Sequence, residues 1–436
     1  MKRAFLKPIW IAAAASLPFL LGTGSCHKNV DPIIFVHGGS GSGAQFESQA
    51  MRFTSNGYPQ GHIAVVEYDS GLQFPAQIEV VLTAIDARIA ELQAATGRDQ
   101  VVLMGHSRGT TVSHAYLAFP DRAANVAKYV NIDGATALAP PGGVPTLALW
   151  AGAARPVQGQ IVGATNVTIP NQEHIQVATS EESFIEMYQF IHGHPPHTSK
   201  ILPDIRPRIA GRATLFPANV GLDGATLDIW WVNGDTGQRI GSQPRATYAI
   251  GPDGHWGPFK GWYGLSYEFA LTREGELDLN YFYEPFIRDD HLVRLNVAEG
   301  LSPFIDSSDA STALTVVRFK EFWGDRGVEN DVLDVGGTNV ITAVNSPSGS
   351  VGGASSAIFL FDENSDGVSN FASIPFPFGP LAFLTAADFF IPSQPPGTLS
   401  VETVPRGDAG AARTVNVRNI PSTTGRVVIQ LNDFEQ

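Results

Sequence analysis

The sequence predicts an α/β domain with a doubly wound, mostly parallel sheet, followed by one or two antiparallel β-sandwich or barrel domains. Between residue 31 and about residue 200, short apolar runs alternate with segments of helical spacing, which is the pattern of βαβ units. From about residue 210 the chain changes to short strand-like runs separated by turn residues, which is typical of antiparallel sheets. With 436 residues the chain is also longer than an ordinary single domain, so two or three domains are expected.

In the first region, buried strands are expected at residues 33–36, 63–66, 101–104, 127–132, 145–150 and 161–169. A helix is expected over 78–92, because its apolar residues recur on one helical face. Further helices are expected at 110–119, ending before Pro120, and at 181–191.

In the second region, strand-like runs fall at residues 227–232, 267–271, 277–283, 292–297, 314–319, 357–361 and 427–431. A Pro-rich join from Pro195 to about Gly211 separates the two regions. We therefore predict a catalytic domain over 30–200 and β-rich domains over 210–300 and 301–436, the last a candidate for lipid binding. The run 371–391 holds six phenylalanines, which fit either a β-domain core or an exposed lipid-binding surface.

Residues 1–25 have the features of a targeting segment, with Lys2 and Arg3 followed by the apolar stretch 9–21. Small residues then precede Cys26, the single cysteine, as in a bacterial lipoprotein signal. Acylation of Cys26 with membrane anchoring and ordinary secretion with a free Cys26 are the alternatives. Either predicts export, and a lone cysteine excludes an intramolecular disulfide.

The net charge of −14 argues against a nucleic-acid partner, because phosphate binding needs a basic face. Metal sites are not expected either. His192, His194 and His197 have no recognised zinc-ligand spacing, and the stretch from Asp362 to Gly367 lacks the glutamate that would complete a calcium loop.

The motif Gly105-His106-Ser107-Arg108-Gly109 matches G-x-S-x-G between a predicted strand and a predicted helix. Side chains at Gly105 and Gly109 would collide where strand and helix fold back on each other. The helix N-terminus adds free N–H groups beside the serine oxygen. Ser107 is therefore the candidate nucleophile, with a structural turn as the alternative.

A serine nucleophile needs a histidine base and a carboxylate to orient that base. His174 follows the last predicted strand, where this topology would put the base, although a lone histidine can also be a surface residue. Asp133 follows the strand 127–132, at the sheet edge where such sites lie; its alternative is a capping role. The order Ser107, Asp133, His174 is the order that this fold uses.

Negative charge on the attacked carbonyl oxygen needs backbone N–H donors. The first expected donor is the N–H of Arg108, directly after the nucleophile. The second is the N–H of Gly39, in the loop after the first strand, with Ser40 as the neighbour that could replace it.

The segment His37-Gly38-Gly39, the G-x-S-x-G motif, Asp133 and His174 together resemble an α/β-hydrolase lipase. They are similar in particular to archaeal and bacterial lipases with a C-terminal β-domain for lipid binding. The likeness continues through residues 285–295, Trp323-Gly324-Asp325 and 432–434. It implies an exported serine carboxylic-ester hydrolase without a cofactor, which acts on acyl esters or lipids and favours longer acyl chains. Two alternatives remain: a short-chain or polyester-directed esterase with a structural C-terminal half, and a non-catalytic surface binding protein.

Overall fold

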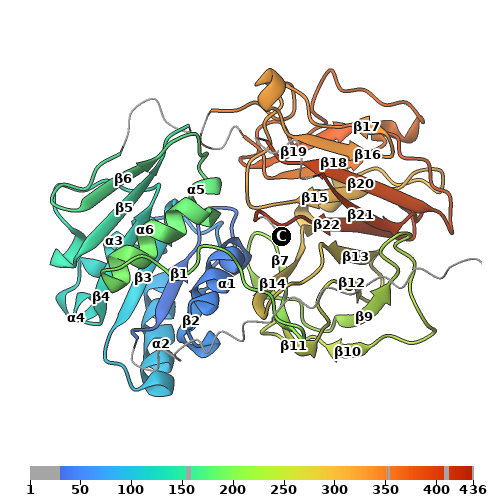
Figure 1. Ribbon diagram of the computed structural model, residues 1–436. Coiled ribbons are helices and arrows are strands. Elements are labelled where there is room, and N and C mark those ends of the chain that lie inside the picture. Colours follow the sequence, from blue (N-terminus) through green and yellow to red (C-terminus); the bar gives the residue numbers. More distant parts are fainter. Residues whose placement is uncertain (1–29, 154–158, 350, 352–353, 407–411, 435–436) are drawn as a thin grey trace, which may run out of the picture.

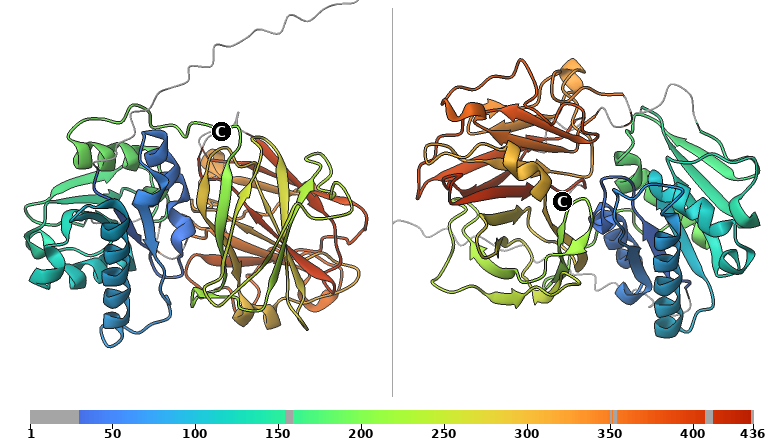
Figure 2. Two further views of the ribbon diagram at one scale, coloured as in Figure 1. Left: turned by 90° about the horizontal axis from the view of Figure 1, so that it is seen from below. Right: turned by 180° about the vertical axis from the view of Figure 1, so that it is seen from behind.

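The computed structural model describes residues 30–153, 159–349, 351, 354–406 and 412–434 (Figure 1). The predicted targeting segment 1–25 and Cys26 lie outside these residues. An N-terminal α/β domain packs beside a larger β-rich half, as the views of Figure 2 also show. Within the described ranges, no helix is both long enough and apolar enough to cross a membrane.

The α/β domain is built on a parallel sheet with the strand order β2-β1-β3-β4-β5-β6. Its strands are β1 (Ile33–Val36), β2 (Ile63–Val66), β3 (Val101–His106), β4 (Val126–Ile132), β5 (Thr146–Ala151) and β6 (Thr165–Ile169). The predicted parallel α/β fold is therefore confirmed. The last strand is shorter than expected, because residues 162–164 form a turn before it.

Helices cover both faces of this sheet (Figure 1). They are α1 (Glu47–Ser55), α2 (Ile78–Thr96), α3 (Arg108–Leu117), α4 (Pro120–Ala123), α5 (Gln176–Thr179) and α6 (Glu181–His192), with the short 3-10 helices η1 (Gly43–Phe46), η2 (Gln60–His62) and η3 (Pro141–Gly143). In β1, Ile33 and Phe35 pack with residues of α1 and α6, whereas Ile34 and Val36 pack with residues of α2 and α3. Burial on both faces explains why these strands are continuous apolar runs.

The β-rich half consists of a long sheet and smaller sheets packed against it (Figures 1 and 2). The long sheet has the order β10-β9-β12-β13-β22-β15-β18-β19; the smaller ones are β11-β7-β14, with β8 beside β7, and β17-β16-β20-β21. The strands are β7 (Arg208–Leu215), β8 (Val220–Gly221), β9 (Thr226–Val232), β10 (Ala246–Ala249), β11 (His255–Lys260), β12 (Ser266–Thr272), β13 (Asp278–Tyr283), β14 (Asp290–Val297), β15 (Leu314–Val317), β16 (Val332–Val335), β17 (Thr338–Asn339), β18 (Ala357–Phe361), β19 (Leu384–Asp388), β20 (Thr398–Val404), β21 (Arg413–Arg418) and β22 (Gly425–Gln430), with the 3-10 helices η4 (Glu299–Phe304), η5 (Gly327–Glu329) and η6 (Glu363–Ser365).

The pairing in this half is mixed rather than purely antiparallel. The last strand, β22, lies between β13 and β15 and is parallel to both. The long sheet thus joins strands from before and after residue 300. The domain boundary predicted at residue 300 stays a prediction.

The phenylalanine-rich run 371–391 is divided between the core and the surface. Phe378 and Phe389 are buried in hydrophobic clusters, whereas Phe376 is 74% exposed. Phe383 is different, because its ring faces the α/β domain at the candidate site described next.

Candidate active site

Ser107 lies at the sharp turn between β3 and α3. Its backbone has φ 53° and ψ −122°, a strained conformation for a residue with a side chain. The Ser107 N–H donates to the Ile132 carbonyl oxygen at 2.9 Å, and the Thr110 N–H donates to the Ser107 carbonyl oxygen at 2.9 Å. The turn therefore holds a half-buried Ser107 at the carboxyl end of a central strand.

Glycines make this close turn possible. A Cβ atom at Gly109 would lie 2.2 Å from the Val36 carbonyl oxygen, and one at Gly105 would lie 2.7 Å from the Gly109 carbonyl oxygen. A Cβ atom at Gly38 would approach the Ser107 Cβ to 2.9 Å. In the sequence, Gly38 stands out only as part of the segment His37-Gly38-Gly39, and its contact with Ser107 emerges from the fold.

Asp133 and His174, which are 41 residues apart, form a buried pair. His174 Nδ1 lies 2.5 Å from Asp133 Oδ2, and Asp133 Oδ1 accepts the Ala151 N–H at 3.1 Å. Asp133 is fully buried and His174 is 2% exposed. His174 Nε2 has no hydrogen-bond partner among the described residues. The imidazole therefore has one nitrogen tied to a carboxylate and the other available for proton transfer.

His106, the residue before Ser107, connects the serine turn to the His174 loop. Its Nε2 lies 2.8 Å from the His174 carbonyl oxygen, and its Nδ1 lies 2.7 Å from Gln45 Nε2. Because Gln45 Nε2 is a donor, these contacts fit a neutral ring that carries its proton on Nε2. Burial lowers the pKa of His106 to about 3, and the neighbouring His174 acts in the same direction.

The candidate oxyanion donors are the N–H groups of Arg108 and Gly39. Arg108 is the first residue of α3, so its N–H has no acceptor within that helix. Gly39 is partly buried in the loop after β1, and Ser40 beside it is exposed with φ 54°. The Arg108 guanidinium donates to the Ser70 carbonyl oxygen at 2.6 Å and stacks 4.0 Å from the Phe74 ring centroid, which anchors the neighbouring loop.

The β-rich half also reaches this site. Phe383 stacks on the His174 ring, with the ring centroids 5.7 Å apart and the planes 15° apart. Phe383 has φ 66°, and its carbonyl oxygen accepts the N–H groups of Ser356 and Ala357. No sequence signal identified this contact beyond the phenylalanine-rich run, because it forms only when the two halves pack together.

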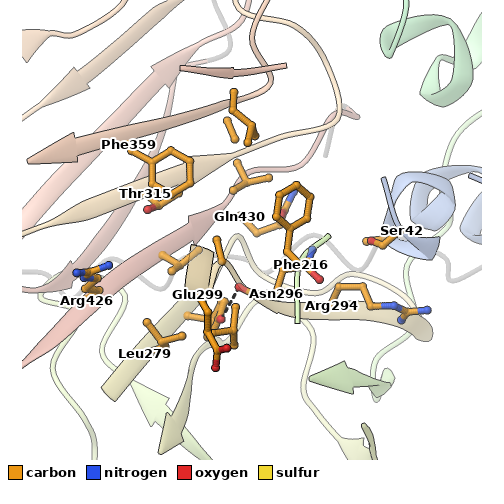
Figure 3. A pocket seen from close by; sticks show the side chains of 18 of the residues that line it. Ser42, Phe216, Leu279, Arg294, Asn296, Glu299, Thr315, Phe359, Arg426 and Gln430 are labelled. Carbon is orange, nitrogen blue, oxygen red and sulfur yellow. Dashed lines mark hydrogen bonds between the residues drawn. The ribbon is translucent and has the colours of Figure 1, made fainter. Parts of the chain in front are cut away.

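A cavity of about 450 Å³ is lined mostly by residues of the β-rich half and also by residues of the α/β domain, among them Ser40 and Ser42 (Figure 3). Ser107 and His174 do not line it, but Ser40, next to Gly39, and Leu384, next to Phe383, do. Its lining combines apolar side chains with a few charged ones; examples from Figure 3 are Phe216, Leu279, Arg294, Glu299, Phe359 and Arg426. The cavity thus adjoins the site from the sides of the Gly39 and Phe383 loops.

The described residues include no group of three or more His, Cys, Asp or Glu side chains arranged to hold a metal ion. Of the predicted site residues, Asp133 and His174 are in direct contact. Ser107 and Arg108 directly follow His106, which binds the His174 carbonyl oxygen, and Gly39 directly follows Gly38, which lies against Ser107. Ser107 makes no hydrogen bond to His174 Nε2 in this structure. Cys26 lies outside the described residues.

Three family models match successive parts of the chain. Residues 30–130 match the class 2 lipases, residues 206–299 match the lipase C-terminal domain, and residues 300–435 match a further C-terminal domain. The class 2 lipase match includes Ser107 but ends before Asp133 and His174. No curated protein matches the chain.

Several solved structures are similar to parts of the chain. A gene product of Listeria innocua is 12% identical over 39% of this chain and 97% of its own, with a TM-score of 0.30. A predicted CIB-like hydrolase from Thermoplasma acidophilum is 18% identical over 38% of this chain and 86% of its own, with a TM-score of 0.28. The Bacillus licheniformis lipase BlEst2, in its propeptide form, is 11% identical over 89% of this chain and 93% of its own, with a TM-score of 0.30.

The family matches cover the strand–serine–helix turn as well as both parts of the β-rich half. Over residues 30–130 the chain is thus similar to the class 2 lipases, and over residues 206–299 to the lipase C-terminal domain.

Proposed function

We propose that the protein is an exported serine carboxylic-ester hydrolase that cleaves lipid esters with long acyl chains through an acyl-enzyme intermediate. The observation that carries this proposal is the buried Asp133–His174 pair beside the strained Ser107 turn. A nucleophile, a base and a carboxylate that orients the base are the parts that this chemistry needs.

In the proposed mechanism, Ser107 Oγ attacks the ester carbonyl carbon while His174 Nε2 takes the hydroxyl proton. The negative charge on the carbonyl oxygen is stabilised by the N–H groups of Arg108 and Gly39. Each such donor is typically worth about 10²–10³ in rate. When the tetrahedral intermediate collapses, His174 gives the proton to the leaving alcohol oxygen, and a water molecule then releases the acid from Ser107 by the reverse steps.

The surroundings of His174 support its role as the base. Asp133 accepts the Nδ1 proton, which leaves the Nε2 lone pair available for the Ser107 hydroxyl. His106, with its pKa lowered by burial to about 3, stays neutral at working pH, so it adds no positive charge next to the imidazolium that forms.

The cavity supports a long acyl chain as the preferred substrate. Its volume of about 450 Å³ is in the range of small-molecule sites, and it adjoins the Gly39 and Phe383 loops. A chain bound to Ser107 could extend from this side of the site into the β-rich half. An esterase that prefers short chains would make no use of this cavity.

Export belongs to the same proposal and rests on the first 26 residues of the sequence. The charged start, the apolar stretch and Cys26 fit either an acylated anchor or ordinary secretion.

The test is hydrolysis of p-nitrophenyl esters of increasing chain length by the mature protein, with Ser107→Ala alongside. We expect an optimum at long chains for the wild type and a loss of at least about 10³-fold in kcat for Ser107→Ala. Full hydrolysis by Ser107→Ala would overturn the mechanism, whereas a Ser107-dependent optimum at the shortest chain would favour the short-chain esterase. No hydrolysis at any length would favour the binding protein.

A further inference from the structure

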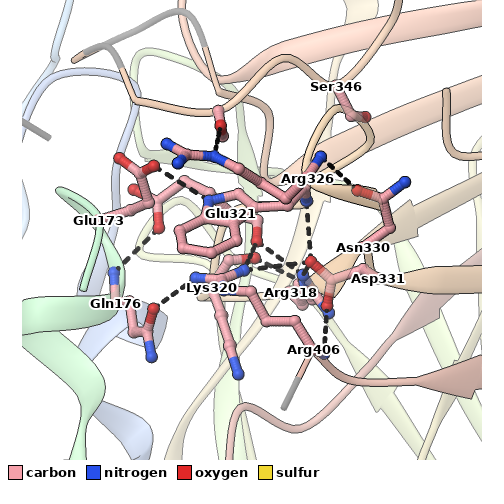
Figure 4. A network of polar contacts seen from close by, with 12 residues as sticks. Glu173, Gln176, Arg318, Lys320, Glu321, Arg326, Asn330, Asp331, Ser346 and Arg406 are labelled. Carbon is pink, nitrogen blue, oxygen red and sulfur yellow. Dashed lines mark hydrogen bonds and ion pairs between the residues drawn. The ribbon is translucent and has the colours of Figure 1, made fainter. Parts of the chain in front are cut away.

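A short segment of the β-rich half holds the loop that carries His174. This segment, residues 320–323, follows β15, and the loop, residues 173–176, precedes and begins α5. Figure 4 shows side chains from both segments meeting in one polar network. The network lies between the two halves of the molecule and outside the Ser107 turn.

Glu321 makes the most direct contact with this loop. Its Oε1 accepts the N–H of Ile175, and its Oε2 accepts the N–H of Gln176 at 3.2 Å. These are the two residues directly after His174. Glu321 is 1% exposed, so water does not compete for the two N–H groups.

These hydrogen bonds supply what the loop itself lacks. Helix α5 begins at Gln176, and no side chain caps it from Ile175. The first N–H groups of a helix have no acceptor within that helix and are costly to bury without a partner. Glu321, 146 residues away from Ile175 in the sequence, takes the place of a local cap.

A second connection lies on the other side of His174. The Trp323 indole N–H donates to Glu173 Oε1 at 3.0 Å, and the Gly349 N–H donates to the same oxygen at 2.7 Å. Glu173 is 1% exposed. The residues before and after His174 are thus both bound to the β-rich half.

The 320–323 segment is itself held by buried charged groups. Arg318 donates to the Glu321 carbonyl oxygen at 2.6 Å and lies 2.8 Å from Asp331 Oδ2. Arg406 donates to that same carbonyl and lies 3.1 Å from Asp331 Oδ2. Asp331 also accepts the Trp323 N–H at 2.8 Å. Glu321 therefore reaches the His174 loop from a fixed backbone.

Three further residues contact His174 and leave its Nε2 available. Asp133 binds the ring at Nδ1, His106 binds the backbone carbonyl, and Phe383 covers one ring face. The N–H groups that follow His174 depend on Glu321. We propose that Glu321 is a positioning residue for His174, so that the β-rich half fixes the place of the base in addition to its part in substrate binding. This proposal rests on the proposed function, because it assumes that His174 is the base.

Rate is sensitive to such positioning. A displacement of about 1 Å caused by a change away from the reacting atoms can lower the rate about 10²-fold. The residues that contact Glu321 do not line the cavity, so substrate binding should change little. A positioning role therefore predicts a loss in kcat with a nearly constant KM.

The experiment compares Glu321→Ala and Glu321→Gln in the full chain with a matched control, Glu268→Ala. Glu268 is a fully buried carboxylate of the same half, paired with Arg239 and Arg418. It lies on β12, far from the His174 loop in sequence, and its ion-pair partners also belong to the β-rich half. The readouts are kcat and KM for a long-chain p-nitrophenyl ester, the rate of Ser107 labelling by an organophosphonate, and the melting temperature.

We expect Glu321→Ala to lower kcat and the labelling rate about 10²-fold with KM unchanged. Glu321→Gln keeps one acceptor oxygen, so we expect a smaller loss, about 10-fold. Glu268→Ala should lower the melting temperature but leave kcat unchanged. If Glu321→Ala does not fold, the kcat of Glu321→Gln tests the positioning role.

A folded Glu321 variant with wild-type kcat would overturn the proposal, and so would an equal kcat loss in Glu268→Ala. Ser107→Ala, measured in parallel, separates the two levels of inference. If that variant still hydrolyses the ester, the proposed function has failed. If it is inactive while the Glu321 variants are normal, only the positioning role has failed.

Discussion

The two carboxylate oxygens of Asp133 contact different partners, the His174 ring and the backbone of β5. One oxygen lies 2.5 Å from His174 Nδ1, and the other accepts the Ala151 N–H at 3.1 Å. Because Asp133 is fully buried, its charge is compensated by these contacts rather than by water. The same residue therefore anchors the end of β4 and fixes which imidazole nitrogen carries the proton.

At this scale we predict that Asp133→Asn lowers kcat about 10³–10⁴-fold with little change in KM. The amide keeps an acceptor for Ala151, but its NH₂ group would donate to His174 Nδ1 and move the ring proton to Nε2. Steady-state kinetics on a p-nitrophenyl ester would measure the effect. The exposed Asp121→Asn serves as the control, and a wild-type kcat in Asp133→Asn would contradict the assigned role.

One wall of the cavity is formed by alternate side chains of neighbouring strands in the long sheet. Side chains two residues apart point to the same face of a sheet. Leu279, Tyr281 and Tyr283 of β13 follow this spacing, as do Thr315 and Val317 of β15, and Arg426, Val428 and Gln430 of β22. Since β22 lies between β13 and β15, one face of the long sheet forms a continuous wall of the cavity.

We predict that Val428→Trp, on the central strand of this wall, selectively reduces activity on long acyl chains. The indole would fill space that the chain occupies, so kcat/KM for the longest esters should fall on the order of 10- to 200-fold. Activity on a two-carbon acyl ester should stay near wild type. Val428→Ala keeps the cavity open and should preserve the long-chain preference; loss of that preference in both variants alike would argue against the cavity as the acyl site.

Across the whole molecule, the β-rich half contacts the loops on both sides of Ser107. On the His174 side it does so through Glu321, Trp323 and Phe383. On the Gly39 side, Asn219 donates to the carbonyl oxygens of Gly41 at 2.9 Å and Tyr68 at 3.0 Å. A buried ion pair adds to this side: Arg294 Nε donates to Glu67 Oε1 at 2.9 Å, and the Gly43 N–H donates to the same oxygen at 3.0 Å.

This ion pair predicts a pH-dependent part of the stability. Burial alone would raise the pKa of Glu67, but Arg294 and His37 outweigh it and lower the pKa to about 2. A carboxyl whose pKa is lowered on folding stabilises the folded state above its unfolded pKa, here about 4.5, and this contribution is lost as the pH falls toward 2. Glu67→Gln should therefore destabilise the protein by about 3 kcal/mol near pH 7, because it leaves Arg294 buried without its partner.

The measurement is the difference in melting temperature between wild type and Glu67→Gln across the pH range. We expect a large difference at pH 6–7 that shrinks as the pH is lowered below about 4.5. Glu91→Gln, which removes an exposed i,i+3 pair with Arg88, should change little at any pH. A Glu67→Gln effect that is independent of pH would contradict the ion pair as its cause.

Much of the α/β domain could be predicted because its signals are local. The apolar runs of β1 and β3, the helical spacing of Val81, Leu82 and Ile85 in α2, and the glycines around Ser107 each lie within a few residues of one another. Whether neighbouring strands of the β-rich half are parallel or antiparallel was harder to predict from the sequence. Nothing near residues 425–430 indicates that this strand inserts, in parallel, between β13 and β15.

The sequence by itself therefore determined the parallel α/β fold, the turn that presents Ser107, and Asp133 and His174 as candidates from their order along the chain. Only the tertiary structure decided that these two residues meet at 2.5 Å, that Phe383 covers the imidazole, and that Glu321 holds the loop after it. The physical reason is the distance along the sequence over which each interaction acts. Backbone propensity and side-chain spacing act between neighbours in the sequence, whereas a contact such as Glu321 with Ile175, 146 residues apart, exists only where the α/β domain and the β-rich half pack together.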